Sequence, residues 1–221
     1  MTRMLAVRLD NAGDVLLTGP ALRAAANTFD EVVLLAGPHG VEAGRLLPGV
    51  DRVIEWRCPW IDPEPAPVDA DDLDRLVDQL RLLELDAALV FTSFHQSALP
   101  TALALRLAGV GWVGAISEDY PGSLLDLRHH VDDDLPEAER ALSLAAGAGL
   151  SLPDADDGAL RLRTPLPPRS RFVGSRPYIV LHPGTSVPAR AWPDFRFREC
   201  CEELLGLGWQ VVVTGAPSER G

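Results

Sequence analysis

The chain has 221 residues, of which 47% are apolar and 24% are charged, and these proportions exclude wholesale disorder and a fibrous repeat. Acidic residues outnumber basic ones by 32 to 20, for a formal net charge of −12. This balance argues against a nucleic-acid partner and allows at most a peripheral association with a membrane.

Short apolar runs alternate with segments of helical periodicity along the first two thirds of the chain. The apolar runs predict strands at 4–9, 31–36, 52–56 and 87–92, and a short one ending at 116. The periodic segments, several with capping residues, predict helices at 14–26, 69–85, 97–107 and 136–146. This alternation with short loops predicts the α/β class, with a parallel sheet covered by helices on both faces.

Residues 163–177 interrupt this pattern with four prolines and four arginines in fifteen residues. Proline is rare in helix interiors and central strands, so we interpret the segment as an interdomain linker. The sequence then predicts a strand at 178–181, a helix at 193–205 and a strand at 209–213. We expect a first domain at 1–162 and a partial second domain at 178–221, because two strands and one helix do not complete a covered sheet. A piece of this kind is expected to self-associate.

Three further features limit the chemistry. The sequence has no apolar run near the roughly 20 residues of a membrane span, so a cytoplasmic location is expected. Its three cysteines, Cys58, Cys200 and Cys201, lack the spacing of a disulfide framework or a zinc site. No lysine is present, which excludes Schiff-base catalysis. We expect neither a metal nor a cofactor.

The first candidate site follows the first predicted strand, where Asp10 to Asp14 read Asp-Asn-Ala-Gly-Asp. Ligands of open α/β sheets bind beyond the carboxyl ends of the strands. Gly13 allows a close approach to the backbone, and Asp14 either caps the following helix or faces a ligand. The loop has no G-x-G-x-x-G motif, which disfavours a dinucleotide-binding oxidoreductase.

Two more loops follow strands of the second predicted domain. Residues 182–193 combine hydroxyls, free amides and Arg190 at a helix entry, an arrangement that suits a phosphate group but also describes a proline-stiffened surface turn. Residues 214–219 end in Glu219, whose carboxylate could accept hydrogen bonds from ribose hydroxyls. The histidine pair at 129–130 and the acidic run at 132–134 are interpreted as structural.

Taken together, these three loops resemble the motifs of glycosyltransferase family 9, the ADP-heptose:lipopolysaccharide heptosyltransferases and their relatives. The resemblance implies a GT-B fold and an inverting, metal-independent transfer of a heptose, or a related sugar, from an ADP-sugar to a saccharide or glycolipid acceptor, as in lipopolysaccharide biosynthesis. Two features depart from the family pattern. The sequence ends before the family's later Asp-Thr/Ser-Gly-x-x-His segment, and Arg190 stands where some members have lysine.

The same resemblance implies roles for individual residues. Asp14 matches the family's general base. The residues implied to bind the donor diphosphate and ribose are Thr185, Ser186, Arg190 and Glu219. The residues assigned to the acceptor side by their places near strand ends are Asn11, Gly13, His95 and Arg128. The alternative is a non-catalytic relative that keeps the fold and binds a sugar or a partner protein; for the 221-residue chain alone we expect little or no activity.

Overall fold

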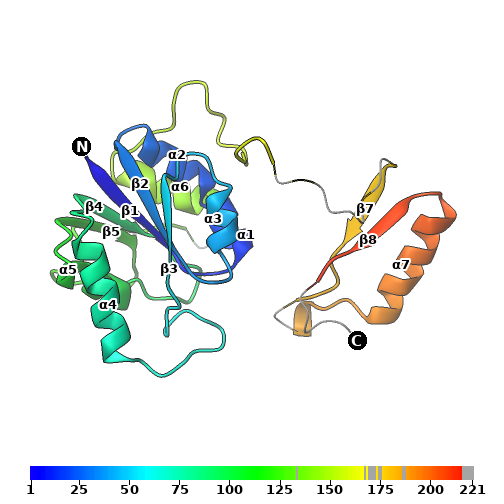
Figure 1. The fold of residues 1–221 in the computed structure, drawn as a ribbon, viewed down its shortest axis with the longest axis horizontal. Helices are drawn as coiled ribbons and strands as arrows, with labels where there is room; N and C mark the ends of the chain where they lie inside the picture. The colour runs from blue at the N-terminus through cyan, green and yellow to red at the C-terminus, as the bar shows by residue number, and fades with distance from the viewer. Residues whose placement is uncertain (133, 167, 169–172, 174–175, 186–187, 216–221) are drawn as a thin grey trace. The chain divides into compact units, whose positions relative to one another are not determined.

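A computed structural model describes residues 1–221 except 133, 167, 169–172, 174–175, 186–187 and 216–221. The chain divides into two compact units, Met1–Leu166 and Pro167–Gly221. Figure 1 shows both units, each built on its own sheet.

The first unit is built on a sheet of six strands whose neighbours are all parallel. In spatial order these are β3 (Arg52–Glu55), β2 (Glu31–Ala36), β1 (Arg3–Arg8), β4 (Ala87–Val90), β5 (Trp112–Ile116) and β6 (Leu127–His129). The order reverses direction between β1 and β4, so the carboxyl ends of these two strands form the switch point at which α/β sheets bind ligands. The predicted α/β fold is confirmed.

Helices cover both faces of this sheet (Figure 1). On one face lie α1 (Ala12–Leu17), α2 (Gly19–Ala26), α3 (Val41–Arg45) and α6 (Glu137–Gly147), and on the other lie α4 (Ala70–Arg81) and α5 (Leu99–Leu107). Strand β1 supplies both cores, because side chains alternate across a strand. Leu5 and Val7 pack beneath α4 and α5, whereas Met4 and Ala6 pack beneath the other four helices.

The helices differ from the sequence prediction in two places. The helix expected at 14–26 is two helices, separated at Thr18. Pro20 has no N–H for an intrahelical bond, and its ring clashes with the preceding turn, so the second helix has to start afresh there. The helix expected at 69–85 ends at Arg81, although Asp69 caps it as predicted by accepting a bond from the Asp71 amide at 2.9 Å. Two short elements, α3 and β6, were not predicted.

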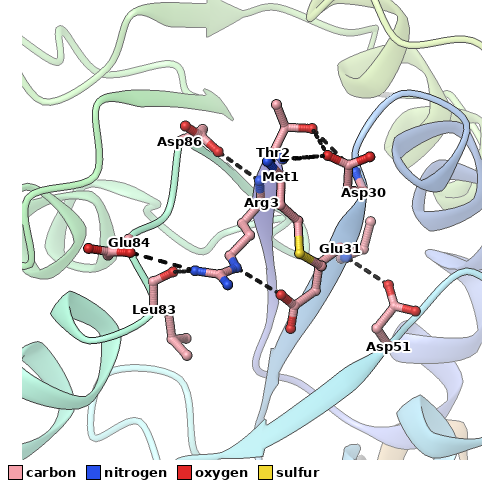
Figure 2. Close-up of polar contacts among 10 residues, drawn as sticks. Met1, Thr2, Arg3, Asp30, Glu31, Asp51, Leu83, Glu84 and Asp86 are labelled. Atoms are coloured by element: carbon pink, nitrogen blue, oxygen red, sulfur yellow. Dashed lines mark hydrogen bonds and ion pairs between the residues drawn. The ribbon is translucent and has the colours of Figure 1, made fainter.

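At the amino edge of the sheet, aspartates placed directly before strands bind the amides of the neighbouring strands. Figure 2 shows three of them: Asp30 accepts from the Thr2 amide at 2.6 Å, Asp86 from the Arg3 amide at 2.7 Å, and Asp51 from the Val32 amide at 2.9 Å. Asp126, before β6, accepts from the Val113 amide at 2.7 Å. Each carboxylate satisfies an N–H at a strand start and helps to set the register.

After α6 the chain passes back over α2 and is bound to it by ionic contacts. Arg23, on α2, donates to both carboxylate oxygens of Asp156, at 2.7 and 2.9 Å, and to the Ala159 carbonyl at 2.9 Å. Arg163, where the linker was expected to begin, still donates to the carbonyls of Leu47 and Val50. The first unit therefore includes this returning segment.

The second unit contains β7 (Tyr178–Leu181) and β8 (Gln210–Val213), which pair in parallel, with α7 (Asp194–Gly206) between them in the sequence. A short 3-10 turn, η1 (Pro188–Arg190), precedes α7. Both strands and the helix lie where the sequence predicted them. This βαβ arrangement brings the loops that follow β7 and β8 to the same edge of the sheet.

The contact between Arg23 and Asp156 predicts acid sensitivity of the first unit. Hydrogen bonds from Arg23 hold the pKa of the Asp156 carboxyl well below its ordinary value of 3.8. A carboxyl with a depressed folded-state pKa stabilises the fold above its unfolded pKa and loses that contribution as the pH falls towards the folded value. We expect Asp156→Asn to lower the urea midpoint of unfolding at neutral pH. We also expect the midpoint of this variant to fall less than that of the wild type as the pH is lowered to about 3. Asp154 is exposed, and Asp154→Asn is the control. If the urea midpoints of the two variants fell equally between neutral pH and about pH 3, the prediction would be contradicted.

Candidate functional site

The candidate site lies at the carboxyl end of β1, where Asp14 occupies the first turn of α1. Its two carboxylate oxygens have different partners. Oδ2 accepts a hydrogen bond from the Asn11 amide at 3.3 Å, which caps the helix, and Oδ1 lies 3.4 Å from Nη2 of Arg8. The Asp14 side chain is 29% exposed. Asp14 therefore caps α1 while one oxygen stays in a polar, partly open position.

Arg8 is the residue around which the site is organised. Its side chain is only 1% exposed, although it ends a strand whose four central residues are apolar. Nη1 lies 2.8 Å from Oε1 of Glu137, on α6, and Nη2 lies 2.9 Å from Oδ2 of Asp10. Nη2 also donates to Oγ of Ser93 at 2.7 Å. One guanidinium thus joins β1, α6 and the loops after β1 and β4 to Asp14.

Only part of this cluster was foreseen from the sequence. Glu137 and Ser93 lie 129 and 85 residues from Arg8 in the chain, and no local pattern connects them. The sequence feature that could have predicted this cluster is Arg8 itself. An arginine in a buried parallel strand has to find anions, since an isolated buried charge is strongly unfavourable.

A cleft of about 630 Å³ opens beyond β4 and β5, beside this cluster. Its walls come from the loop after β4, the loop after β5 and the segment that leads into α6. The lining residues are Thr92–Ala98, Ile116–Asp119, Val131, Asp132 and Arg140. Ser93 belongs both to the cleft wall and to the partners of Arg8, so the cleft and Asp14 share one hydrogen-bond network.

Close packing fixes the loop after β1, which carries Asp10, and the start of α1, which carries Asp14. A Cβ added to Gly37 would overlap the carbonyl oxygen of Leu9, and one added to Gly40 would overlap the Val15 side chain. The turn after β2 can approach the end of β1 only because these two positions are glycines. A Cβ at Gly13, in contrast, would meet nothing within 4 Å, so packing within the described chain does not require that glycine.

The remaining acceptor-side residues lie in different surroundings. Asn11 is exposed at the start of α1, and His95 is exposed in the cleft wall. Arg128, on β6, donates to the carbonyls of Ser117 and Glu118. Arg128 therefore holds the loop after β5, whose residues 117–119 line the cleft, and is not itself part of the lining.

The donor-side residues belong to the second unit. Arg190 ends η1 and is exposed, and Thr185 is exposed in the loop after β7. His182 and Thr214, which follow β7 and β8, meet through Nδ1 and Oγ1 at 3.0 Å, so the two loops are joined at the base. Ser186 and Glu219 lie outside the described residues.

Two further titratable groups have surroundings that suit structural roles. Burial lowers the pKa of His129, with a smaller contribution from His130, and its Nε2 lies 3.1 Å from Oγ of Ser143 on α6. Burial raises the pKa of the Cys58 thiol to about 12, which leaves it protonated and unreactive at neutral pH.

Among the described residues, no group of three or more His, Cys, Asp or Glu side chains is placed to hold a metal ion. None of their helices combines the length and the apolar character that crossing a membrane requires.

The model of the family described as glycosyltransferase family 9 (heptosyltransferase) matches residues 73–221. No curated protein matches the chain significantly.

Similar solved structures include Escherichia coli ADP-heptose lps heptosyltransferase II (20% identity, TM-score 0.73) and E. coli heptosyltransferase WaaC with ADP-2-deoxy-2-fluoro heptose (23%, 0.71). A glycosyl transferase family 9 structure from Veillonella parvula is also similar (14%, 0.75). Each comparison covers 99% of this chain and 66%, 70% and 64% of the other chain, respectively. The chain thus spans about two thirds of their length. At these identities the likeness shows the fold, which is the expected GT-B type.

The contrast between two glycines tests how the loop after β1 is held. Gly37→Ala should lower the free energy of unfolding by about 1–3 kcal/mol, because the added methyl group displaces the Leu9 backbone. Gly13→Ala should leave stability unchanged or raise it by up to ~1 kcal/mol, since alanine favours a helix more than glycine. Urea denaturation of both variants measures the difference. Equal stabilities would show that the turn after β2 does not brace this loop.

Proposed function

The chain belongs to glycosyltransferase family 9, the heptosyltransferase family, and from this premise we propose that it moves a heptose or a related sugar from an ADP-sugar to a saccharide or glycolipid acceptor. The transfer inverts the anomeric centre and uses no metal. The observation that carries the proposal is the placement of Asp14, at the carboxyl end of β1 with one oxygen beside a buried guanidinium.

In the proposed reaction Asp14 is the general base. The acceptor hydroxyl gives its proton to the Asp14 carboxylate while the acceptor oxygen forms a bond to the anomeric carbon. The bond between that carbon and the ADP oxygen breaks on the opposite side, and ADP leaves with the electron pair. A carboxylate suits this role because the proton has to be removed as the sugar develops positive character.

The contacts of Asp14 hold its carboxyl group in one orientation, as a general base requires. The Asn11 amide and the Arg8 guanidinium each contact a different oxygen, which restrains the carboxyl group on two sides. Arg8 is in turn held by Glu137 and Asp10. Catalytic groups gain from such restraint, since a misplacement of about 1 Å can cost 10²-fold in rate.

The donor is proposed to bind the second unit through its diphosphate. Arg190 and Thr185 supply a cation and a hydroxyl near the start of α7, and fixed positive charge can take the place of a metal ion at a leaving diphosphate. Ser186 and Glu219 stay predictions for the diphosphate and the ribose. The choice of an ADP-sugar is supported by two WaaC structures, one with ADP-2-deoxy-2-fluoro heptose and one with ADP.

Replacing the proposed base tests the reaction. In the full-length protein, Asp14→Asn should lower kcat by about 10²- to 10⁴-fold, because general-base catalysis contributes that much. The Asn side chain can still accept the Asn11 hydrogen bond, so folding and ADP affinity should be retained. Asp71→Asn, an exposed carboxyl in the first turn of α4, is the control. If Asp14→Asn kept the wild-type kcat, Asp14 would not be the general base, and its role would be to cap α1.

Removing a cation tests the donor side. We expect Arg190→Ala to weaken ADP binding by roughly one to two decades, since a charge-assisted hydrogen bond to phosphate contributes about 1.5–3 kcal/mol. Titration calorimetry with ADP measures the change. Arg196→Ala provides the control, because Arg196, on α7, is paired with Glu199 at 2.9 Å. Equal affinity of the Arg190→Ala and wild-type proteins would place the diphosphate elsewhere.

A further inference from the structure

The loop after β4 contains a tight turn in an unfavourable backbone conformation. The Gln96 amide donates to the Ser93 carbonyl at 3.1 Å, which closes a four-residue turn with Phe94 and His95 at its centre. His95 has a φ of 72°. This position of such a turn favours glycine, because a side chain is strained there. The strain is therefore maintained by the surrounding structure, which holds the backbone of the turn in this conformation.

Both ends of the turn are held tightly. The Ser93 amide donates to Oε1 of Gln96 at 2.9 Å, and Oγ of Ser93 donates to Asp10 at 2.5 Å while accepting from Arg8 at 2.7 Å. The network that holds Asp14 thus also holds this turn. Residues at the turn centre are consequently presented at a fixed place relative to Asp14.

The turn displays two aromatic rings in the wall of the cleft. Phe94 is 53% exposed although it is a large apolar side chain, and its ring meets that of His95 edge to face, with centroids 4.1 Å apart. An exposed phenyl ring in a concave site offers a flat apolar surface to a ligand, and a phenylalanine side chain has only two rotatable bonds to immobilise.

The rest of the cleft is hydrogen-bonding and mainly acidic. Its charged lining residues are Glu118, Asp119, Asp132 and Arg140. Three carboxylates against one guanidinium repel a phosphate-bearing ligand and suit one rich in hydroxyl groups.

We propose that the Phe94–His95 turn is a saccharide platform, on which the C–H face of a neutral pyranose ring stacks while its hydroxyls bond to the acidic and amide groups of the cleft. The inference rests on the proposed function and deepens it, because it assigns the acceptor sugar to this cleft and makes Phe94 a residue that determines acceptor binding. A nucleobase is the other flat ligand that could stack there, and the acidic lining disfavours a nucleotide.

Saturation-transfer NMR with the full-length protein tests the platform, using methyl pyranosides of glucose, galactose and mannose as probes and adenosine as the competitor. Saturation should reach the ring C–H protons of at least one pyranoside, and adenosine should not displace it. We expect Phe94→Ala and Phe94→Leu to bind that sugar about tenfold more weakly, a change of ~1.4 kcal/mol. Leu103→Ala, an exposed apolar residue on α5 outside the cleft, is the matched control and should bind normally.

A second variant separates platform loss from misfolding. His95→Gly removes the backbone strain at the positive φ of this residue, so it should raise the melting temperature while weakening sugar binding. Absence of saturation transfer to all three pyranosides, displacement by adenosine, or unchanged binding by Phe94→Ala would each overturn the inference. These outcomes leave the turnover of Asp14→Asn and the ADP affinity of Arg190→Ala unaffected, so failure of the platform is distinguishable from failure of the proposed transfer.

Discussion

A guanidinium removed from water at the end of a buried strand has to be surrounded by anions and hydrogen-bond acceptors, because an unpaired buried charge costs several kcal/mol. Glu137, Asp10 and Ser93 bind the two terminal nitrogens of Arg8, and Asp14 completes the group, while Nε of Arg8 has no partner among the described residues. These partners come from separate segments of the first unit. The need to satisfy one side chain therefore draws together the candidate base, the helix α6 and the turn that borders the cleft.

The acidic composition of the chain has two structural uses at opposite edges of the first sheet. At the amino edge, Asp30, Asp51 and Asp86 bind strand amides (Figure 2). At the carboxyl edge, carboxylates gather around Arg8 and line the cleft. The carboxylates at the amino edge accept hydrogen bonds from backbone amides, whereas those at the carboxyl edge contact side chains or face the open cleft. Net charge alone does not separate these uses, because the distinction depends on which edge an aspartate occupies.

Elements with a strong local signal were predictable. The strand at 31–36 is apolar after Glu31 and has the predicted bounds, and Asp69 starts α4 as its capping chemistry requires. Elements that depend on packing against other parts of the chain were not predictable. β6 has three residues and exists through its pairing with β5, while α3 spans one turn and packs against α1 and β3. Short segments of this kind carry too little periodicity to be read locally, since tertiary packing supplies most of their stability.

The sequence by itself determined the α/β class, the family motifs and the position of Asp14 after the first strand, because strand and helix periodicities and a strand-end loop are local features. Only the tertiary structure decided what Asp14 faces and where the cleft lies. The ion pair between Arg8 and Glu137 joins residues 129 positions apart, and the strained turn at His95 is held through Ser93 by Arg8, at the end of β1, and by Asp10. Such contacts depend on the packing of the whole unit, which no short stretch of sequence specifies.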